Sequence, residues 1–561
     1  MMKKGIRADL WIIFSIILVY LILAIPNLYY TDLHCDEADP GIFGINFLMG
    51  KEIADASSVS IRFCGKRFPV DQTQSYAFAL PSYLLIPFFI LFGINVVALK
   101  FLGITLAIVS LAALYYICIV LFNRRIAVLT VFLLSISSVF VFSTRVELRI
   151  GENMLNSFFW VSVAFFILYF RKKASIVYFC LGCLLFGMGF SIKLSFLARA
   201  LGLFFAAILI FPKGIGFCKL KFKIRHIFIA IICFCLGAFL FIYYNVMTKG
   251  ETFRLVRYFS APTEIGVNNL DFKANFNRRL SHFNAIVNED VSHFDADGIL
   301  DNLKPRLNKN IMLIIFWVAL GFNLLFLFRK DRLEIKKVLF IYITYIGMFF
   351  TSLFTPFSSR TFHLLVIEPI PAFTLALFLN NIYGVTGRFR NKKVFKRFVI
   401  PLIFATILGP FLITDVDNLI FYHSTLRKTG GAYLGPVRYE VVDYILSQKI
   451  DENKIFSMAH FWLDVAPFIT HGKKKNFNYS LPETGDMSTF SSDAYADRLK
   501  DVLGENDEKI YFLLCLDPSM GYSEKYSILQ KGVNQLNKKI RLEQVFYNKI
   551  REPQYNLYCV E

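Results

Sequence analysis

The acidic, basic and histidine residues that could take part in catalysis or bind an anion lie in four short stretches between long apolar runs. Thr31–Pro40, just after the first apolar run, carries four acidic residues and a histidine. The others are Ser143–Asn153, the turn around Lys193, and Thr355–His363 with Arg360. One carboxylate can act as a general base, and fixed cations can stabilise the negative charge that develops on a departing phosphate.

The first stretch offers the preferred catalytic carboxylate, Asp36, with Glu37 beside it and His34 as a secondary candidate. Acidic residues in such a place often cap a helix, and Asp36 or Asp39 could cap the segment that follows. Here, however, the acids follow a membrane-spanning run and precede an apolar segment expected to lie flat on the membrane. That arrangement holds a carboxylate at the depth of lipid headgroups, which favours a catalytic role.

The second stretch offers another carboxylate and two cations. Glu152 begins the next apolar helix, where packing fixes its position, so it is preferred as a catalytic residue over Glu147, the secondary candidate. Arg145 and Arg149 are then available to bind an anion. Ion pairs among these neighbours would also explain the alternation of acids and bases.

Two later turns supply single cations. Lys193 is the lone charge between two apolar runs. A lysine there often extends its amine to the membrane surface, but an ionisable residue at that depth is a functional candidate by default. Arg360 precedes another apolar run, with His363 as a secondary candidate. Together with Arg145 and Arg149, Lys193 and Arg360 form the predicted phosphate-binding set.

This set of residues suits the displacement of a lipid phosphate by an acceptor hydroxyl. Phosphate leaves as a stable anion without a general acid, so one carboxylate base is sufficient and a single displacement inverts the sugar's anomeric carbon. Hydrolysis of an ordinary glycoside would instead need two carboxylates that flank a poor leaving group. The residues therefore predict transfer of a sugar from a lipid-phosphate carrier.

The composition indicates which elements position these residues. The 561-residue chain is 56% hydrophobic and only 18% charged, against about 25% charged in soluble domains. This excludes a single soluble domain, a disordered chain and a small disulfide-bonded protein. The net charge of +20 does not indicate a nucleic-acid partner, because the basic residues lie in short clusters between apolar runs, the pattern that sets membrane topology.

Eleven apolar runs are long enough to cross about 30 Å of hydrocarbon. They are residues 9–30, 95–122, 126–143, 153–170, 174–191, 194–212, 226–247, 311–328, 338–354, 363–383 and 398–414. A further run, 75–93, contains two prolines and is predicted to lie at the interface without crossing. The alternate connections then carry 24 basic residues on the N-terminal side, and the short connections opposite carry four. The positive-inside rule places the N-terminus in the cytoplasm and the four polar stretches outside.

The predicted architecture is a polytopic α-helical membrane module, residues 1–414, followed by an extracytoplasmic α/β domain, residues 415–561. Within the module, residues 31–94 and 248–310 form long outer segments. The C-terminal domain is predicted to alternate helices with apolar strands in a parallel or mixed sheet. Its helices are expected at 434–449, 492–504 and 522–538, and its strands at 454–458, 509–516, 541–548 and 555–560.

Four of the ten cysteines fall on the predicted outer face. An oxidising compartment would permit the disulfides Cys35–Cys64 and Cys515–Cys559, and the sequence leaves both pairings open. Cys180 and Cys183 are spaced as in a metal site, but no second pair accompanies them, so packing within the membrane is the better interpretation.

The order of these motifs along the chain is shared with a known group of membrane proteins. Asp36-Glu37-Ala38 follows the first helix, and a proline-rich aromatic stretch spans 81–93; then come Asn123-Arg124-Arg125, Arg145 to Glu152, Lys193 and Arg360. This order resembles the GT-C membrane glycosyltransferases of the protein O-mannosyltransferase and lipid A aminoarabinose transferase group. The resemblance covers most of residues 1–400. The C-terminal domain resembles only the variable extracytoplasmic domains that such proteins carry.

The resemblance implies a glycosyltransferase of the plasma (inner) membrane, which takes a hexosyl or pentosyl group from a polyprenyl-phosphate-linked monosaccharide. The acceptor would be a hydroxyl of a glycolipid, polysaccharide or protein on the extracytoplasmic face. The family's first-loop acid corresponds to Asp36, with Glu37 beside it, and its second acid to Glu152. Its lipid-phosphate cations correspond to Lys193 and Arg360.

Other functions remain open at this stage. Relatives that use lipid monophosphates generally need no metal, so no cofactor is expected; the alternative is a divalent ion held by His34, Asp36 and Glu152. A flippase or transporter for a lipid-linked sugar usually shows two matching halves, which the sequence lacks. A lipid-linked saccharide polymerase or ligase, or a receptor, is also possible. The expected partners are the donor, the acceptor and membrane lipids.

Overall fold

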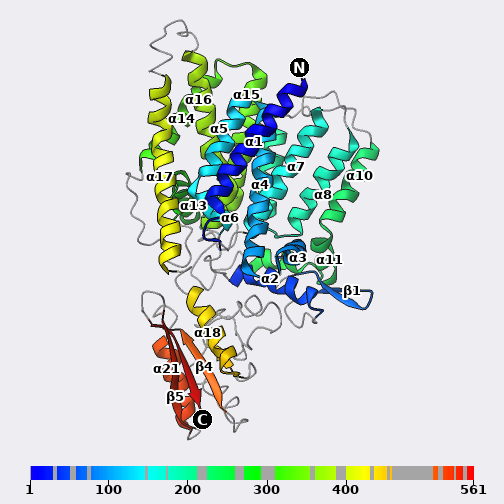
Figure 1. The fold of residues 1–561 in the computed structure, drawn as a ribbon. Coiled ribbons are helices and arrows are strands. Elements are labelled where there is room, and N and C mark those ends of the chain that lie inside the picture. The colour runs from blue at the N-terminus through cyan, green and yellow to red at the C-terminus, as the bar shows by residue number, and fades with distance from the viewer. Residues whose placement is uncertain are drawn as a thin grey trace.

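Helices dominate the computed structural model (Figure 1). It describes residues 2–28, 35–50, 59–71, 77–145, 150–171, 175–210, 224–258, 271–291, 310–353, 361–386, 400–429, 435–450, 455–457, 509–515, 522–535, 538–547 and 553–561. The long bundle consists of α1 (Met2–Ala24), α4 (Val96–Leu121), α5 (Arg124–Ile136), α6 (Ser138–Arg145), α7 (Ile150–Arg171), α8 (Ile176–Phe190), α9 (Phe196–Ile210), α10 (Ile224–Gly237), α11 (Phe239–Met247), α14 (Asn310–Leu327), α15 (Arg332–Ser352), α16 (Pro369–Thr386) and α17 (Ile400–Thr429).

Each of the eleven predicted apolar runs overlaps at least one of these helices. By length and composition alone, four helices of the described chain can cross a membrane, or up to six if each of two bent pairs forms one span. The bent pairs are α5 with α6, at 59°, and α10 with α11, at 72°. The prediction of a polytopic helical membrane protein is therefore confirmed.

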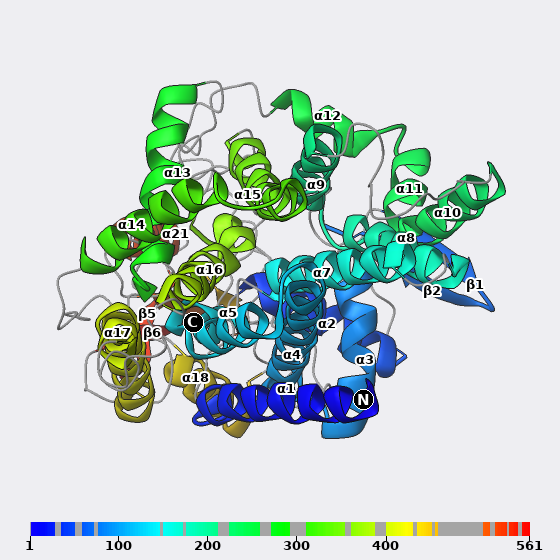
Figure 2. The ribbon, with the colours of Figure 1, turned by 90° about the horizontal axis from the view of Figure 1, so that it is seen from above.

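Glycines allow neighbouring helices of the bundle to approach closely. Seen along the bundle, α8 lies beside α10, and α9 lies beside α15 (Figure 2). A Cβ atom added to Gly187 of α8 would lie 2.2 Å from the carbonyl oxygen of Phe234 on α10. A Cβ on Gly347 of α15 would lie 2.8 Å from the Cα of Gly202 on α9. Small residues at such crossings bring the two backbones into contact, which is how membrane helices associate without a hydrophobic driving force.

The start of α6 is buried and is capped by side chains from distant parts of the chain. The backbone N–H of Ser138 donates to Oδ1 of Asp415 at 2.8 Å, and that of Val139 donates to Oε2 of Glu289 at 3.0 Å. Asp415 belongs to α17, and Glu289 follows α13 (Phe272–Val287). These carboxylates supply the acceptors that the first backbone N–H groups of a helix lack, so the bend between α5 and α6 is held from two sides.

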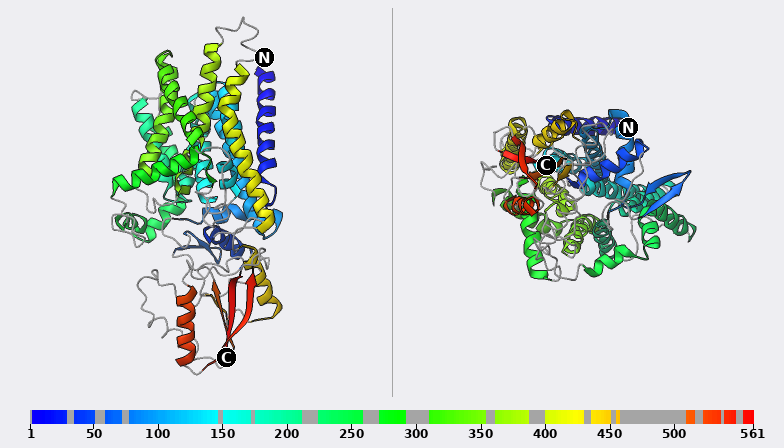
Figure 3. Two further views of the ribbon diagram at one scale, coloured as in Figure 1. Left: turned by 90° about the vertical axis from the view of Figure 1, so that its left-hand side faces the viewer. Right: turned by 90° about the horizontal axis from the view of Figure 1, so that it is seen from below.

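Short elements cover one end of the bundle, here called the C-domain end because the C-terminal domain projects from it (Figures 1 and 3). They are α2 (Cys35–Leu48), the hairpin β1 (Ser60–Phe63) and β2 (Lys66–Pro69), and α3 (Leu80–Phe92). At about 1.5 Å per residue, the 13 residues of α3 extend about 20 Å, which is too short to cross the hydrocarbon. This length agrees with the interfacial position expected for 75–93.

The C-terminal domain is a mixed sheet between helices. Its elements are α18 (Gly435–Ser447), β3 (Ile455–Ser457), β4 (Ile510–Cys515), α21 (Tyr522–Gln535), β5 (Ile540–Tyr547) and β6 (Pro553–Val560), with strand order β3-β4-β6-β5. Strand β3 is parallel to β4, and the other pairs are antiparallel. Phe512 and Leu514 pack with Leu529 of α21. Leu513 points to the other face, so the predicted α/β domain is confirmed; the helix expected at 492–504 lies outside the described residues.

The strand register excludes one of the two disulfides that the sequence left open. Cys515 pairs with Tyr555 and Cys559 pairs with Tyr511, four residues apart along the ladder. That offset is about 13 Å, whereas bridged cysteines have Cα atoms within about 7 Å. Cys559 is a free thiol, and so is Cys64, which is exposed.

Replacing Gly187 with alanine should destabilise the contact between α8 and α10. The added methyl group must displace the backbone of α10, so we expect the free energy of unfolding to fall by about 1–3 kcal/mol. Gly321→Ala in α14 is the matched control, because nothing lies within 4 Å of a Cβ atom at that position. Thermal unfolding of the two variants in detergent compares them directly. Equal midpoints would show that α8 and α10 are not in backbone contact.

Candidate active site

Glu152 is the centre of a buried polar cluster at the C-domain end of the bundle. It lies in the first turn of α7, and only 1% of its surface is exposed. Its Oε2 atom accepts a hydrogen bond from Nη2 of Arg199 on α9 at 2.8 Å. Its Oε1 atom accepts one from Oγ of Ser195 at 3.3 Å and lies 4.0 Å from Nζ of Lys193. The structure thus brings together two of the predicted site residues, Glu152 and Lys193.

Asn156, one turn further along α7, completes the environment of Arg199. Its Oδ1 atom accepts from Nε of Arg199 at 3.1 Å and from Nη2 at 2.8 Å. Its amide nitrogen donates to the carbonyl oxygen of Leu365 in η4 (Thr361–Ile367) at 3.4 Å. A buried guanidinium needs such acceptors because it has lost its hydration. The network therefore fixes α7, α9 and η4 relative to one another.

Lys193 lies on a short turn between α8 and α9 that the segment before α3 holds in place. Ala77 forms an antiparallel bridge with Lys193, and the N–H of Phe78 donates to the carbonyl oxygen of Ile192 at 3.0 Å. Lys193 keeps 23% of its side chain exposed, whereas Arg199 keeps 2%. Of these two cations, Lys193 is the one that a ligand at the C-domain end can reach.

Arg279 of α13 contributes a further cation. Its side chain is fully buried, and the charge of Glu152 offsets part of the cost of that burial. Burial lowers the pKa of Arg279 to about 10, so the guanidinium still carries its charge at neutral pH. Among the side chains that the structure describes, Lys193 and Arg199 lie within 4.0 Å of the Glu152 carboxylate, and Arg279 interacts electrostatically with it. Such a cluster of cations attracts an anion.

The α2 helix places the predicted catalytic acids at the same end of the bundle. Asp36 and Glu37 fall in the first turn of its backbone, although their side chains are not among those described. Gly44 of α2 packs against α3, where an added Cβ atom would lie 3.2 Å from the ring of Phe89. Because α3 begins directly after the segment that bridges to Lys193, α2 and the Glu152 cluster belong to one packed unit.

Arg145, predicted to bind phosphate, makes its described contacts with the protein itself. It is completely buried, and its Nη2 atom donates to the carbonyl oxygen of Pro26 at 2.8 Å. Its Nη1 atom lies 3.3 Å from Nδ1 of His423, and its guanidinium stands 5.0 Å above the ring of Tyr422. Arg145 therefore holds the end of α6 against α1 and α17, a structural task that its sequence neighbourhood does not indicate.

Several predicted site residues lie outside the described part of the chain, in whole or for their side chains. They are His34, Glu147, Arg149, Arg360 and His363. Among the side chains that are described, no group of three histidines, cysteines or carboxylates is arranged to hold a metal ion.

Sequence reasoning missed Arg199, Asn156 and Arg279. Arg199 stands within an apolar run, and the rule that selects Lys193 as an intramembrane ionisable residue applies equally to it. Asn156 has no comparable signal, because polar uncharged residues are common in such helices. Arg279 lies in a polar outer segment with a second arginine beside it, and nothing in that pattern distinguishes the buried residue from its neighbour.

Known proteins resemble this chain in part of its sequence and in its fold. Residues 79–241, which include Glu152, Lys193 and Arg199, match the family model described as dolichyl-phosphate-mannose-protein mannosyltransferase. The structure is similar to ArnT from Cupriavidus metallidurans bound to undecaprenyl phosphate, with a TM-score of 0.56 and 10% sequence identity over 98% of this chain and 97% of that one. The chain has the GT-C fold.

A second GT-C structure extends the comparison. It is the archaeal oligosaccharyltransferase AglB from Archaeoglobus fulgidus in complex with an inhibitory peptide and a dolichol-phosphate, with a TM-score of 0.53 and 11% identity over 94% of this chain and 72% of that one. The comparison with curated proteins gave no match. The family match and the apolar helices indicate an integral membrane protein of the glycosyltransferase type.

Removing the carboxylate of Glu152 should destabilise the GT-C fold strongly. Glu152→Gln leaves the buried guanidinium of Arg199 without its counter-charge, and breaking a buried pair costs about 3–5 kcal/mol. The exposed pair between Lys330 and Glu334, with atoms 2.9 Å apart, is the control: Glu334→Gln should cost about 0.5 kcal/mol or less. Chemical unfolding in mixed micelles measures both. A loss for Glu152→Gln no larger than that of the control would contradict the buried pair.

Proposed function

We propose that this protein is a glycosyltransferase that moves a monosaccharide from a polyprenyl-phosphate carrier to an acceptor hydroxyl. The observation that carries the proposal is the cluster of cations around Glu152, in which Arg199 and Arg279 are buried and Lys193 is partly exposed. The GT-C fold supports it, because the matched family model describes a transferase that uses a lipid-phosphate sugar.

The cations are suited to hold the donor phosphate. Lys193 is partly exposed and lies on a turn fixed by backbone hydrogen bonds, so its amine can meet a phosphate at the membrane surface. Arg199 and Arg279 are buried and both interact with Glu152, so they can add charge that is held in place by packing. Fixed charges stabilise a developing anion without reorganisation, which makes them effective in catalysis. Arg360, Arg145 and Arg149 remain predictions for this role.

In the proposed reaction Asp36 is the general base, with Glu37 beside it. The acceptor hydroxyl gives its proton to the carboxylate, and its oxygen forms a bond to the anomeric carbon of the sugar. The bond from that carbon to the phosphate oxygen breaks on the opposite face, and the electron pair leaves with the lipid phosphate. The configuration at the anomeric carbon inverts, and no metal ion takes part.

The reaction is proposed to occur on the extracytoplasmic face of the plasma (inner) membrane. The N-terminus of α1 lies at the end of the bundle opposite the C-domain end (Figure 1). Arg124 begins α5 and Arg329 follows α14, and these basic helix ends lie on that same side. Positive charge favours the cytoplasm. The candidate site and the C-terminal domain then face outward, where the acceptor is a glycolipid, a polysaccharide or a protein.

Replacing the proposed base should stop transfer. Asp36→Asn keeps the side chain's size but cannot take a proton, so we expect kcat to fall by about a hundredfold or more. The assay uses purified protein in liposomes with a synthetic polyprenyl-phosphate monosaccharide, and the wild-type rate should persist in EDTA. Asp39→Asn, which removes an acid three residues away, is the control. Full turnover by Asp36→Asn overturns the assignment, and donor flux without a glycosidic bond indicates a flippase.

Lys193 should act mainly on donor binding. Lys193→Met keeps the aliphatic chain and removes one charge-assisted contact, so we expect the KM for the donor to rise about tenfold. Lys249→Met is the control, because Lys249 is an exposed lysine just after α11. The affinity for polyprenyl phosphate, measured by titration in detergent, should weaken in parallel. An unchanged KM and affinity would remove Lys193 from the site.

A further inference from the structure

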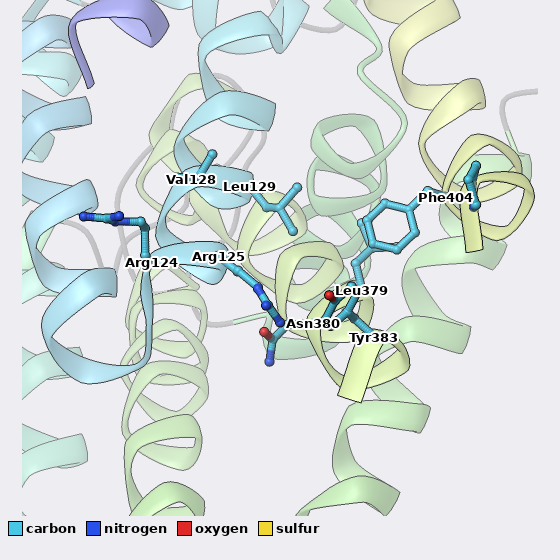
Figure 4. Close-up of a pocket in the computed structure, with 9 residues that line it drawn as sticks. Arg124, Arg125, Val128, Leu129, Leu379, Asn380, Tyr383 and Phe404 are labelled. Atoms are coloured by element: carbon cyan, nitrogen blue, oxygen red, sulfur yellow. The ribbon is translucent and has the colours of Figure 1, made fainter. Parts of the chain in front are cut away.

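An open cavity lies at the end of the bundle opposite the candidate active site. It has a volume of about 550 Å³ and is lined by residues of α5, α16 and α17 (Figure 4). Val128, Leu129, Leu379 and Phe404 form its apolar wall. Cavities that bind small organic ligands span about 300–1,000 Å³ and have mostly apolar walls with a few polar groups. Nothing in the proposed reaction uses this cavity.

Two arginines stand where α5 begins, at the rim of the cavity. The guanidinium of Arg125 lies 4.2 Å from the centre of the Tyr383 ring, which fixes it over α16. Arg124 donates from Nε to Oδ1 of Asp9 at 2.6 Å and keeps 44% of its side chain exposed. Asp9 offsets the charge of Arg124, so the net positive charge of these described side chains comes from Arg125. The apolar wall begins one helical turn further into the bundle.

A cationic rim above an apolar wall is complementary to a lipid whose phosphate lies at the surface and whose acyl chain runs inward. Basic pockets between transmembrane helices recognise anionic lipid headgroups in this way.

We propose that this cavity binds an anionic glycerophospholipid of the leaflet at that end of the bundle. The lipid phosphate lies against Arg125, and one acyl chain follows the wall formed by Leu129 and Phe404. The sugar donor is not the occupant, because its phosphate must reach Lys193 at the opposite end. The site is therefore separate from the proposed reaction, and its occupant stabilises the packing of α5 against α16 and α17.

Native mass spectrometry of the full-length protein tests the proposal with two lipids of identical acyl chains, phosphatidylglycerol and phosphatidylcholine. We expect phosphatidylglycerol to be retained at least fivefold more strongly, since one basic residue near an anionic headgroup contributes about 1 kcal/mol. Arg125→Gln should reduce phosphatidylglycerol retention about fivefold. Arg332→Gln, at the same end of the bundle in the first turn of α15, should leave it within about twofold of the wild type.

Three results would overturn the proposal. One is equal retention of the two lipids by the wild-type protein. Another is the same loss of phosphatidylglycerol in Arg125→Gln and Arg332→Gln, which would indicate general attraction to a basic surface. The third is displacement of the lipid by millimolar inorganic phosphate, which would indicate a simple phosphate site. A filling variant, Leu129→Trp, should weaken lipid retention while Arg125 is still present. Equal unfolding midpoints for all variants in detergent without added lipid confirm that they are folded.

Discussion

The buried ion pair between Glu152 and Arg199 is the interaction on which the candidate site depends. Removing either charge from water costs several kcal/mol, so the pair persists only because Asn156 and Ser195 supply further hydrogen bonds. Those partners come from α7 and from the turn before α9. Satisfying the pair therefore fixes the turn that presents Lys193, and this gives a partly exposed amine a defined position in an otherwise apolar bundle.

In the proposed reaction, the cations around Glu152 would stabilise the leaving group more strongly than the bound donor. A sugar attached to a lipid phosphate forms a diester with one negative charge, and the departing lipid phosphate is a monoester with up to two. Lys193, Arg199 and Arg279 therefore attract the leaving group more strongly as the bond breaks. Interactions that strengthen toward the transition state raise the rate, whereas uniform binding does not.

The sequence predicts the helices well and the site only in part, for reasons that particular residues make clear. Long apolar runs fold as helices whatever their partners, because a lipid bilayer leaves backbone groups no other acceptors. Glu152 and Lys193 stood out as charges at the edges of such runs. Arg199 is 47 residues from Glu152 along the chain, and only the rotation of α9 against α7 brings the two together. The strand register that separates Cys515 from Cys559 is likewise a property of pairing between strands.

Buried contacts hold the bend between α5 and α6 against α17. Glu289 and Asp415 meet at the start of α6, where burial raises the pKa of Glu289 and the two carboxyls share a hydrogen bond. At the other end of α6, Arg145 contacts His423 of α17. Asp415 and His423 of α17 contact the two ends of α6. A displacement of α17 must therefore either break these buried contacts or carry α6 with it. The cost of exposing the buried charges favours motion of α6 and α17 as one unit.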